Sequence, residues 1–413
     1  MTGSLRSPTR PDPLSRDPLL HDQSLRDTLH RRLLDAPFDP VLLERPELRA
    51  RLARMLREEA PLLASTAADI VLDELVDDVG GLGPLEPLLG DPSITEIMVN
   101  GPDRVFVERA GRLVPVSVVI DADTIVRVVE RVIAPLGLRL DRASPMVDAR
   151  LPDGSRLHAV LPPLAPDGPC VSIRRFGATA VPLRAFGVDS RAGSYFDAIV
   201  RAGWNIVVSG ATSSGKTTCC NALARSIDPS ERIVSIEETA ELRLDQPHVV
   251  RLEARPANAE GTGAVSVREL VRSALRMRPD RIIVGEVRGG EALDMLQACN
   301  TGHDGSLSTV HANSPDDAMT RIETLALSGD VPLPLPAIRQ QLVSAIDAII
   351  QVRRGRDGRR SIVSMAEVGL GRGARTRDLL TQVDGRLVAA TAPIRPARRP
   401  EVDLAREWMA CGS

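Results

Sequence analysis

Residues 205–227 read NIVVSGATSSGKTTCCNALARSI, and this stretch guides the interpretation of the whole chain. The apolar run NIVVS predicts a buried strand, GATSSGKT at 210–217 fits the pattern G-x-x-x-x-G-K-[ST], and the following residues are compatible with a helix. Glycines let such a loop curl so that its backbone N–H groups bind an anion, and the helix presents its positive amino end to the same place. The stretch therefore predicts a loop that binds the phosphates of a nucleotide.

The lysine usage of the chain supports this prediction. Of the 52 basic residues, Lys216 is the one lysine and the other 51 are arginines. A wide, planar guanidinium cannot replace a slim ammonium inside a phosphate loop, so a lysine survives where arginine does not fit. We expect Lys216 to reach the β- and γ-phosphates and Thr217 to offer its hydroxyl to Mg²⁺.

Strands and helices alternate on the carboxyl side of this loop. The apolar runs RIVSIEE, RIIVGEVR, SLSTVHA and AIDAIIQVRR predict strands at 232–238, 281–288, 306–312 and 345–354, with helical stretches between them. This alternation is typical of a mostly parallel sheet covered by helices, so we assign the chain to the α/β class.

The amino-terminal part has a different texture. Residues 41–79 carry apolar residues at helical spacing and predict two or three helices, broken near Pro46 and Pro61, and Ile94 to Arg175 predict a small domain of short strands and one helix. The predicted organisation is a disordered arm at 1–40, a helical segment at 41–79, a small α/β domain at 80–178, a hinge at 179–190, a larger α/β domain at 191–370 and a basic tail at 371–413.

Composition excludes several classes of protein. The chain has 413 residues, of which 43% are hydrophobic and 26% charged, so it is not a wholly disordered chain. The formal net charge of −3 and the aromatic content of 2% argue against nucleic-acid binding, because basic excess and stacking platforms are both scarce. Five cysteines without C-x-x-C spacing argue against disulfides and structural zinc. No apolar run reaches the length of a membrane span, and the first residues lack a signal-peptide core, so we expect a cytoplasmic protein.

Several carboxylates follow predicted strands. Glu286 ends an apolar strand, where it could hold Mg²⁺ through water or polarise the attacking water. Glu237, Glu238 and Glu241 follow another strand and would repel one another unless a cation lies nearby. Metal-water coordination or base chemistry is one explanation of this cluster. A solvated turn is the other, and for Glu241 it is nearly as strong.

Two histidines and two cysteines are further candidates. His303 and His311 flank a short strand in a Gly-rich region, where a histidine could sense the γ-phosphate or be bonded for structural reasons alone. Cys219 and Cys220 follow the loop and are interpreted as small apolar packing residues, with a redox switch as the alternative.

The motifs together resemble a known family. GATSSGKTT, IEETAEL and RMRPDRIIVGEVRGGEALDMLQACNTGHDGSLSTVHANSP resemble the hexameric secretion ATPases of type II and type IV systems, most closely the Tad/Cpa branch that assembles Flp-type pili. The segments LGPLEPLLGDPSITEIMVNGPDRVFVER and SPMVDARLPDGSRLHAVLPPLAPDGPCVSIRRF agree, and the resemblance covers about residues 70–370.

The resemblance implies a RecA-like P-loop motor domain, a smaller PAS-like α/β amino-terminal domain and a helical amino-terminal extension. It implies ATP and Mg²⁺ as cofactors, a ring of six copies, and inner-membrane platform proteins of a pilus or secretion system as partners. The protein would then work at the inner face of the cell membrane.

The same resemblance implies roles for individual residues. Glu286 would be the Walker B glutamate, Glu237 and Glu238 would form the acidic box, where the family usually has Asp at position 238, and His303 and His311 would form the His box. Thr217 and Glu286 would hold Mg²⁺, partly through water. The loop residues would be Gly210, Ala211, Thr212, Ser213, Ser214, Gly215, Lys216, Thr217 and Thr218. The arginines that would close over nucleotide, some as arginine fingers, are Arg150, Arg156, Arg174 and Arg175, with ordinary surface arginines as the alternative.

Other functions stay open on the sequence. A nucleic-acid motor of the same superfamily is one, a nucleotide-gated scaffold with negligible hydrolysis is another, and within secretion the cargo could be a folded protein or a type II pseudopilus. Residues 353–399 carry 12 arginines and 4 acidic residues, so this stretch would either contact anionic lipid or form a solvated tail.

Overall fold

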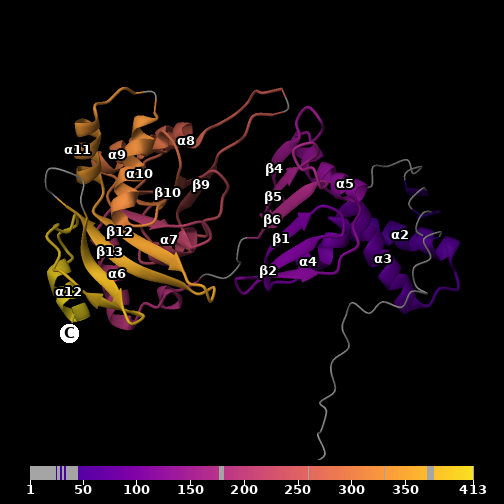
Figure 1. The fold of residues 1–413 in the computed structure, drawn as a ribbon, viewed down its shortest axis with the longest axis horizontal. Helices are drawn as coiled ribbons and strands as arrows, with labels where there is room; N and C mark the ends of the chain where they lie inside the picture. Colours follow the sequence, from indigo (N-terminus) through magenta and orange to yellow (C-terminus); the bar gives the residue numbers. More distant parts are fainter. Residues whose placement is uncertain are drawn as a thin grey trace, which may run out of the picture. The chain divides into compact units, whose positions relative to one another are not determined.

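The computed structural model describes residues 25, 28–29, 32–33, 45–175, 181–258, 260–329, 331–369 and 376–412. Most of the arm predicted at 1–40 and residues 179 and 180 of the predicted hinge lie outside these residues. The chain forms a small unit, made mainly of residues before Arg174, and a large unit, made mainly of residues from Arg174 onward (Figure 1). Among the described helices, none is both long and apolar enough to span a membrane.

The small unit begins with packed helices. Helices α2 (Arg45–Glu59) and α3 (Ser65–Gly80) bury leucines and valines spaced three or four residues apart, which gives each helix one apolar face. Pro46 lies in the first turn of α2, where proline is tolerated, so it begins a helix instead of breaking one. The structure also differs from the predicted disordered arm, because Leu29 and Leu33 are helical and buried in the same cluster as α2 and α3.

A six-stranded sheet follows in the small unit, in the order β3-β2-β1-β6-β5-β4. The predicted helix after the first three strands is α5 (Ala122–Ile133), which begins at the N-cap Asp121 and ends before Pro135 and Gly137, as expected. The remaining elements are α4 (Glu86–Gly90), β1 (Ile94–Asn100), β2 (Val105–Arg109), β3 (Arg112–Val116), β4 (Met146–Arg150), β5 (Arg156–Val160) and β6 (Cys170–Arg174).

The large unit contains a nine-stranded sheet in the order β15-β14-β13-β12-β7-β11-β10-β8-β9. The pairs from β9 to β12 are parallel, and β13, β14 and β15 add antiparallel pairs at one side. Its strands are β7 (Ile206–Gly210), β8 (Ile233–Glu237), β9 (Val249–Glu253), β10 (Arg281–Val287), β11 (Leu307–His311), β12 (Ala348–Arg354), β13 (Arg360–Val368), β14 (Thr376–Val383) and β15 (Arg386–Ala389). The α/β class is therefore confirmed.

Helices cover both faces of this sheet, which explains why its central strands are apolar throughout. Ile206 and Val208 of β7 face one buried cluster with residues of α6 and α7, while Val207 faces a second cluster with residues of α8 to α11 (Figure 1). The helices are α6 (Ser190–Arg201), α7 (Lys216–Ala224), α8 (Val267–Ala274), α9 (Glu291–Asn300), α10 (Pro315–Leu327), α11 (Leu335–Ala345) and α12 (Leu404–Gly412).

The structure differs from the expected tail at 371–413. Within the described residues of this stretch, β14 and β15 extend the sheet and α12 packs against α6. The stretch reads as polar and basic because antiparallel strands at the side of a sheet are only partly buried, as the pattern of TRDLLTQV in β14 shows, with its two leucines buried. The alternatives of a solvated tail or a lipid-binding tail both assumed that no fold formed here.

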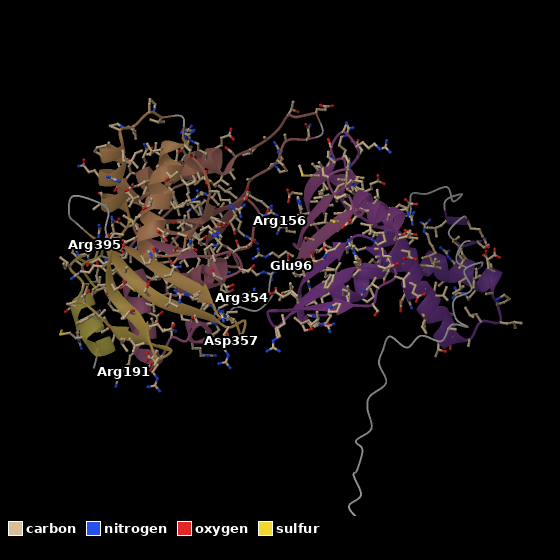
Figure 2. The ribbon with its side chains drawn as sticks, viewed as in Figure 1. Glu96, Arg156, Arg191, Arg354, Asp357 and Arg395 are labelled. Atoms are coloured by element: carbon tan, nitrogen blue, oxygen red, sulfur yellow. The ribbon has the colours of Figure 1, made fainter. Side chains whose placement is uncertain are left out.

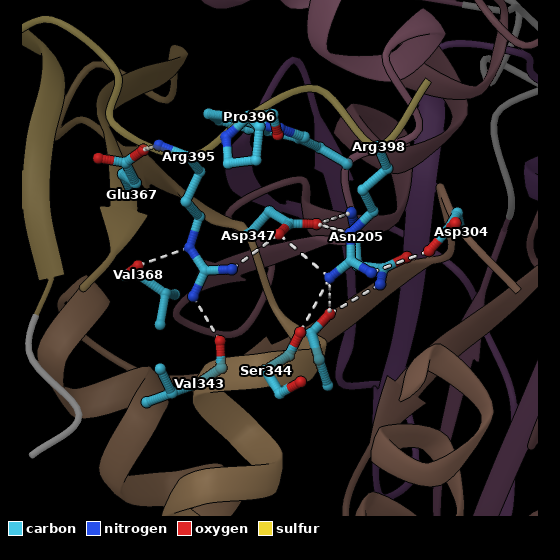
Figure 3. A network of polar contacts seen from close by, with 12 residues as sticks. Asn205, Asp304, Val343, Ser344, Asp347, Glu367, Val368, Arg395, Pro396 and Arg398 are labelled. Carbon is cyan, nitrogen blue, oxygen red and sulfur yellow. Dashed lines mark hydrogen bonds and ion pairs between the residues drawn. The ribbon is translucent and has the colours of Figure 1, made fainter. Parts of the chain in front are cut away.

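Arginines of this carboxyl-terminal stretch enter the core instead of facing solvent. Arg395, labelled in Figure 2, donates to Asp347 Oδ1 at 2.8 Å, and Arg398 donates to Asp347 Oδ2 at 2.6 Å. The backbone N–H of Asn205 adds a third contact to Asp347 Oδ2 at 2.8 Å (Figure 3). We call Asp347, Arg395 and Arg398 the C-terminal clamp. Because Asp347 and Asn205 lie just before β12 and β7, the clamp joins the amino ends of two neighbouring strands to the end of the chain.

Candidate functional site

The predicted phosphate loop connects β7 to α7 at the carboxyl edge of the sheet. Ser213 and Gly215 have φ values of 59° and 95°, so two left-handed residues produce the curl of the loop. A Cβ atom at Gly210 would lie 2.6 Å from the carbonyl oxygen of Val352 on β12, which excludes any side chain there. The loop thus has the strand–loop–helix context that the motif requires.

Lys216 is held inside this loop. Its side chain is 10% exposed, and its Nζ lies 4.0 Å from Glu286 Oε1. Nζ donates to the carbonyl oxygen of Ala211 at 3.1 Å. Burial lowers the pKa of Lys216, and the carboxylate of Glu286 opposes this shift. The ammonium is therefore a partly desolvated cation at the amino end of α7.

These residues fit a bound phosphate chain. The hydroxyl of Ser214 is buried and has no hydrogen-bond partner among the described residues, which is unusual for a buried polar group. A phosphate in the loop would accept hydrogen bonds from the hydroxyl of Ser214 and from the ammonium of Lys216. The hydroxyl of Thr217 and the carboxylate of Glu286 are the kind of oxygen donors that Mg²⁺ prefers.

Glu286 lies near the carboxyl end of β10, two strands away from β7. Arg288 donates to Glu286 Oε2 through Nε at 3.0 Å and through Nη2 at 2.7 Å. The same guanidinium forms an ion pair with Glu238 after β8. Arg288 thus supplies the cation that the clustered carboxylates require. The sequence analysis missed this residue because nothing distinguishes it among 51 arginines.

Glu237 differs from its neighbours because it is 3% exposed. Its Oε1 accepts the backbone N–H groups of Glu241 and Leu242, both at 2.9 Å, so the carboxylate closes the turn after β8. Its Cγ leaves no room for a side chain at Gly285, since a Cβ there would lie 2.7 Å away. Burial raises the pKa of Glu237 to about 7, and the two backbone N–H groups oppose this shift.

This raised pKa predicts a pH-dependent stability. The carboxyl of Glu237 ionises near its ordinary value of 4.5 in the unfolded chain and near 7 in the folded chain. Between pH 4.5 and about pH 7, the unfolded chain binds fewer protons at this carboxyl than the folded chain does. The free energy of unfolding therefore falls as pH rises through this range, by about 3 kcal/mol at most. Urea unfolding of the wild type and of Glu237→Gln at pH 5 and pH 8 measures this loss, which the variant should lack. Glu238→Gln is the control because Glu238 is exposed, and it should keep the wild-type pH dependence.

The two histidines lie at opposite edges of the sheet. His311 ends β11 opposite Gly210, and its Nδ1 lies 3.4 Å from Thr212 Oγ1 of the phosphate loop. His303 precedes β11 at the amino edge, where its Nδ1 donates to the carbonyl oxygen of Ala298 at 3.1 Å. The prediction that both histidines attend the phosphates is therefore corrected for His303 within this chain, because the length of β11 separates them.

The four arginines expected to close over nucleotide lie at strand ends of the six-stranded sheet. Arg150 ends β4, Arg156 begins β5, Arg174 ends β6 and Arg175 follows it (Figure 2 labels Arg156). Their action on a nucleotide stays a prediction.

The cysteines after the loop have the packing role that was expected. Cys219 and Cys220 are both 0% exposed and belong to the cluster between the sheet and α6. Burial raises the pKa of both thiols, to about 12 for Cys220. Neutral, buried thiols are unsuited to a redox switch.

Known proteins resemble this chain in sequence and in fold. The family model described as type II/IV secretion system protein matches residues 78–372. A Mycobacterium tuberculosis (strain H37Rv) protein whose name refers to conjugal transfer is 40% identical over 341 residues, which cover 80% of this chain and 93% of that protein. The type IV secretion system protein PtlH of Bordetella pertussis is 36% identical over 69% of this chain and 93% of its own length. The ATPase DotB of Legionella pneumophila superposes with a TM-score of 0.50 at 19% identity, over 68% of this chain and 79% of DotB, which is evidence on the fold alone. The large unit thus has the RecA-like fold of such ATPases.

Proposed function

The chain belongs to the type II/IV secretion system protein family, and we propose that it is a motor that hydrolyses Mg-ATP to drive secretion or pilus assembly. The observation that carries this proposal is the phosphate loop, in which Lys216 stands at the amino end of α7 beside the hydroxyl of Ser214, which has no partner among the residues that the structure describes. Glu286, near the carboxyl end of β10, lies close to that lysine, with its Oε1 4.0 Å from Nζ.

Each residue of the site has a role in this reaction. The loop and Lys216 bind the β- and γ-phosphates and stabilise the charge that develops as the γ-phosphoryl group leaves. Glu286 orients the attacking water, and Arg288 fixes the position of the Glu286 carboxylate through its two hydrogen bonds. His311 lies at the loop, where it would bond to the terminal phosphate through the nitrogen that does not face Thr212. Mg²⁺, held by Thr217 and through water by Glu286, would neutralise charge on the phosphate oxygens.

We further propose how hydrolysis becomes motion. Six copies would form a ring, neighbouring copies would complete each site with arginines from the set Arg150, Arg156, Arg174 and Arg175, and closure of the small domain over nucleotide would be the working step. The residues between the two domains would act as the hinge. The ring would act on inner-membrane platform proteins from the cytoplasmic side. Specific activity that does not rise with protein concentration would argue against a shared site.

Two kinds of cargo are candidates for what the motor moves. The motifs named in the sequence analysis favour the Tad/Cpa branch and its Flp-type pili. The second candidate is nucleic-acid transport, and it is favoured by the names of curated relatives, which refer to conjugal transfer.

Hydrolysis by the wild type and by Glu286→Gln, each with and without single-stranded DNA, tests the proposal. We expect Mg²⁺-dependent hydrolysis by the wild type, a loss of about 100-fold in kcat in Glu286→Gln, and unchanged ATP binding, because the amide cannot orient the water as a carboxylate does. DNA should leave the wild-type rate unchanged if the cargo is protein. Stimulation by DNA that weakens as salt rises would favour the second candidate. A wild type that binds no ATP would refute both.

A further inference from the structure

A second cation lies beside the phosphate loop, on the side of β7 opposite to Glu286. Arg360 begins β13, which pairs antiparallel with β12, and it lies opposite Arg354 at the carboxyl end of β12. Val352 of β12 is opposite both Gly210 of the loop and Ile362 of β13. Arg360 therefore projects two positions beyond the level of Gly210, at the sheet edge that carries the loop (Figure 2 labels Arg354 and Asp357 in the same β-hairpin).

The side chain of Arg360 lies against the first turn of α7. A Cβ atom at Gly215 would be 2.8 Å from Cδ of Arg360 and 3.5 Å from its Nε. Ile362, on the same face of β13 as Arg360, is buried with Cys219 and Leu223 of α7. Glycine at position 215 thus serves two needs, the left-handed turn of the loop and the space that the stem of Arg360 fills.

The guanidinium of Arg360 forms no hydrogen bond or ion pair with the residues that the structure describes, and the carboxylate of Glu108 acts on it only at longer range. Its neighbour Arg359, in contrast, lies 3.7 Å from Asp357 Oδ2. Burial of part of the side chain, followed by the positive charge of Arg354, lowers the pKa of Arg360 from its usual value. A partly desolvated cation without a partner is costly, and a bound anion would remove that cost.

The order of the strands indicates which part of a nucleotide would meet Arg360. His311 on β11 and Glu286 on β10 lie on one side of β7, and Arg360 on β13 lies on the other side. Hydrolysis requires the γ-phosphate to face Lys216 and Glu286. The phosphate chain must then extend from that end across the amino end of α7, so that its α-phosphate comes toward β12 and β13.

We propose that Arg360 binds the α-phosphate of the nucleotide that the phosphate loop holds. This inference rests on the proposed function of the site. The α-phosphate is present in ATP and ADP and takes no part in the transfer, so Arg360 strengthens substrate, transition-state and product binding alike. It is a binding residue, distinct from Lys216 and Glu286, which act on the transferred group.

Calorimetric titration of ADP into the full chain tests this assignment, with the wild type, Arg360→Gln, Arg359→Gln and Lys216→Ala. Arg360→Gln should weaken ADP binding about tenfold, as expected for the loss of a charge-assisted hydrogen bond. The KM for ATP should rise by a similar factor, with kcat unchanged within about twofold. Arg359→Gln removes the same charge one residue away, from a side chain that is 90% exposed, and should bind ADP as the wild type does.

The outcomes separate this inference from the proposed function. If Arg360→Gln binds ADP as tightly as the wild type while Lys216→Ala loses binding, the assignment is wrong and the proposed function stands. If the wild type itself binds no ADP, the proposed function fails. A fall in kcat with unchanged KM in Arg360→Gln would also overturn the assignment. Thermal unfolding without nucleotide, in which Arg360→Gln should be at least as stable as Arg359→Gln, ensures that the comparison concerns binding and not folding.

Discussion

Replacing Lys216 by alanine should lower kcat/KM for ATP by about 10³-fold, the largest effect on activity that we expect from a single residue. The ammonium is the cation of the loop, its side chain is 10% exposed, and its charge would face the β- and γ-phosphates where hydrolysis places negative charge. Lys216→Arg should be nearly as damaging although it keeps the charge. The guanidinium is planar and wider than the ammonium, whose Nζ lies 3.1 Å from the Ala211 carbonyl oxygen and 4.0 Å from Glu286 Oε1.

Steady-state hydrolysis and ADP titration measure both variants. The matched control is Arg225→Ala, which removes a cation at the other end of α7, where Arg225 lies 3.4 Å from the exposed carboxylate of Asp245. This control should behave as the wild type. Wild-type activity in Lys216→Arg would contradict the idea that the loop selects a slim ammonium, and with it the reason for the one lysine of this chain.

Replacing Asp347 by alanine should lower the free energy of unfolding by about 3–5 kcal/mol, the largest loss of stability that we expect. Asp347 is 3% exposed and accepts from Arg395, Arg398 and the backbone N–H of Asn205. Its removal leaves the buried guanidinium of Arg395 without its carboxylate, and Arg398 keeps only its ion pair with Asp304. In a unit of about this size the transition temperature should fall by about 6–20 °C, as measured by scanning calorimetry of the full chain.

Asp357→Ala is the control for the clamp. Asp357 lies in the turn between β12 and β13, its side chain is 61% exposed, and its removal should change stability by less than about 0.5 kcal/mol. If Asp347→Ala and Asp357→Ala unfolded at the same temperature, the clamp would stabilise the protein no more than an exposed ion pair does. The prediction that the clamp holds the carboxyl-terminal stretch in the fold would then be wrong.

The central strands of the large sheet could be predicted from the sequence because they are covered on both faces. Runs such as IVVSG and IVSIE are buried at every position, so they stand out against the polar turns around them. The last strands could not be predicted in the same way. β14 mixes buried leucines with threonine and arginine, and the arginines of the clamp pair with Asp347, which lies 48 residues from Arg395 and 51 from Arg398. Charge counts along the chain do not reveal partners at that separation.

The candidate site shows the same division between local and distant information. The phosphate loop is a continuous motif, and its residues lie where the pattern predicts. His303 does not lie there, because β11 separates it from His311 and carries the two histidines to opposite edges. Arg288 and Arg360 could not be found among 51 arginines. What distinguishes Arg288 is its ion pair with Glu238, 50 residues away, and what distinguishes Arg360 is its packing against Gly215 of the loop.

The strand order also governs how the protein must be made on the ribosome. β7 emerges first but pairs with β11 and β12, whose first residues, Leu307 and Ala348, are synthesised long after Gly210. At about 5–20 residues per second, the nascent phosphate loop waits on the order of 10 s for both neighbours. Asp347 then waits for Arg395 and Arg398, which follow it by 48 and 51 residues and are synthesised about 2–10 s later at the same rate. A chain cut before Arg395 would therefore leave the carboxylate of Asp347 without either of its guanidinium partners.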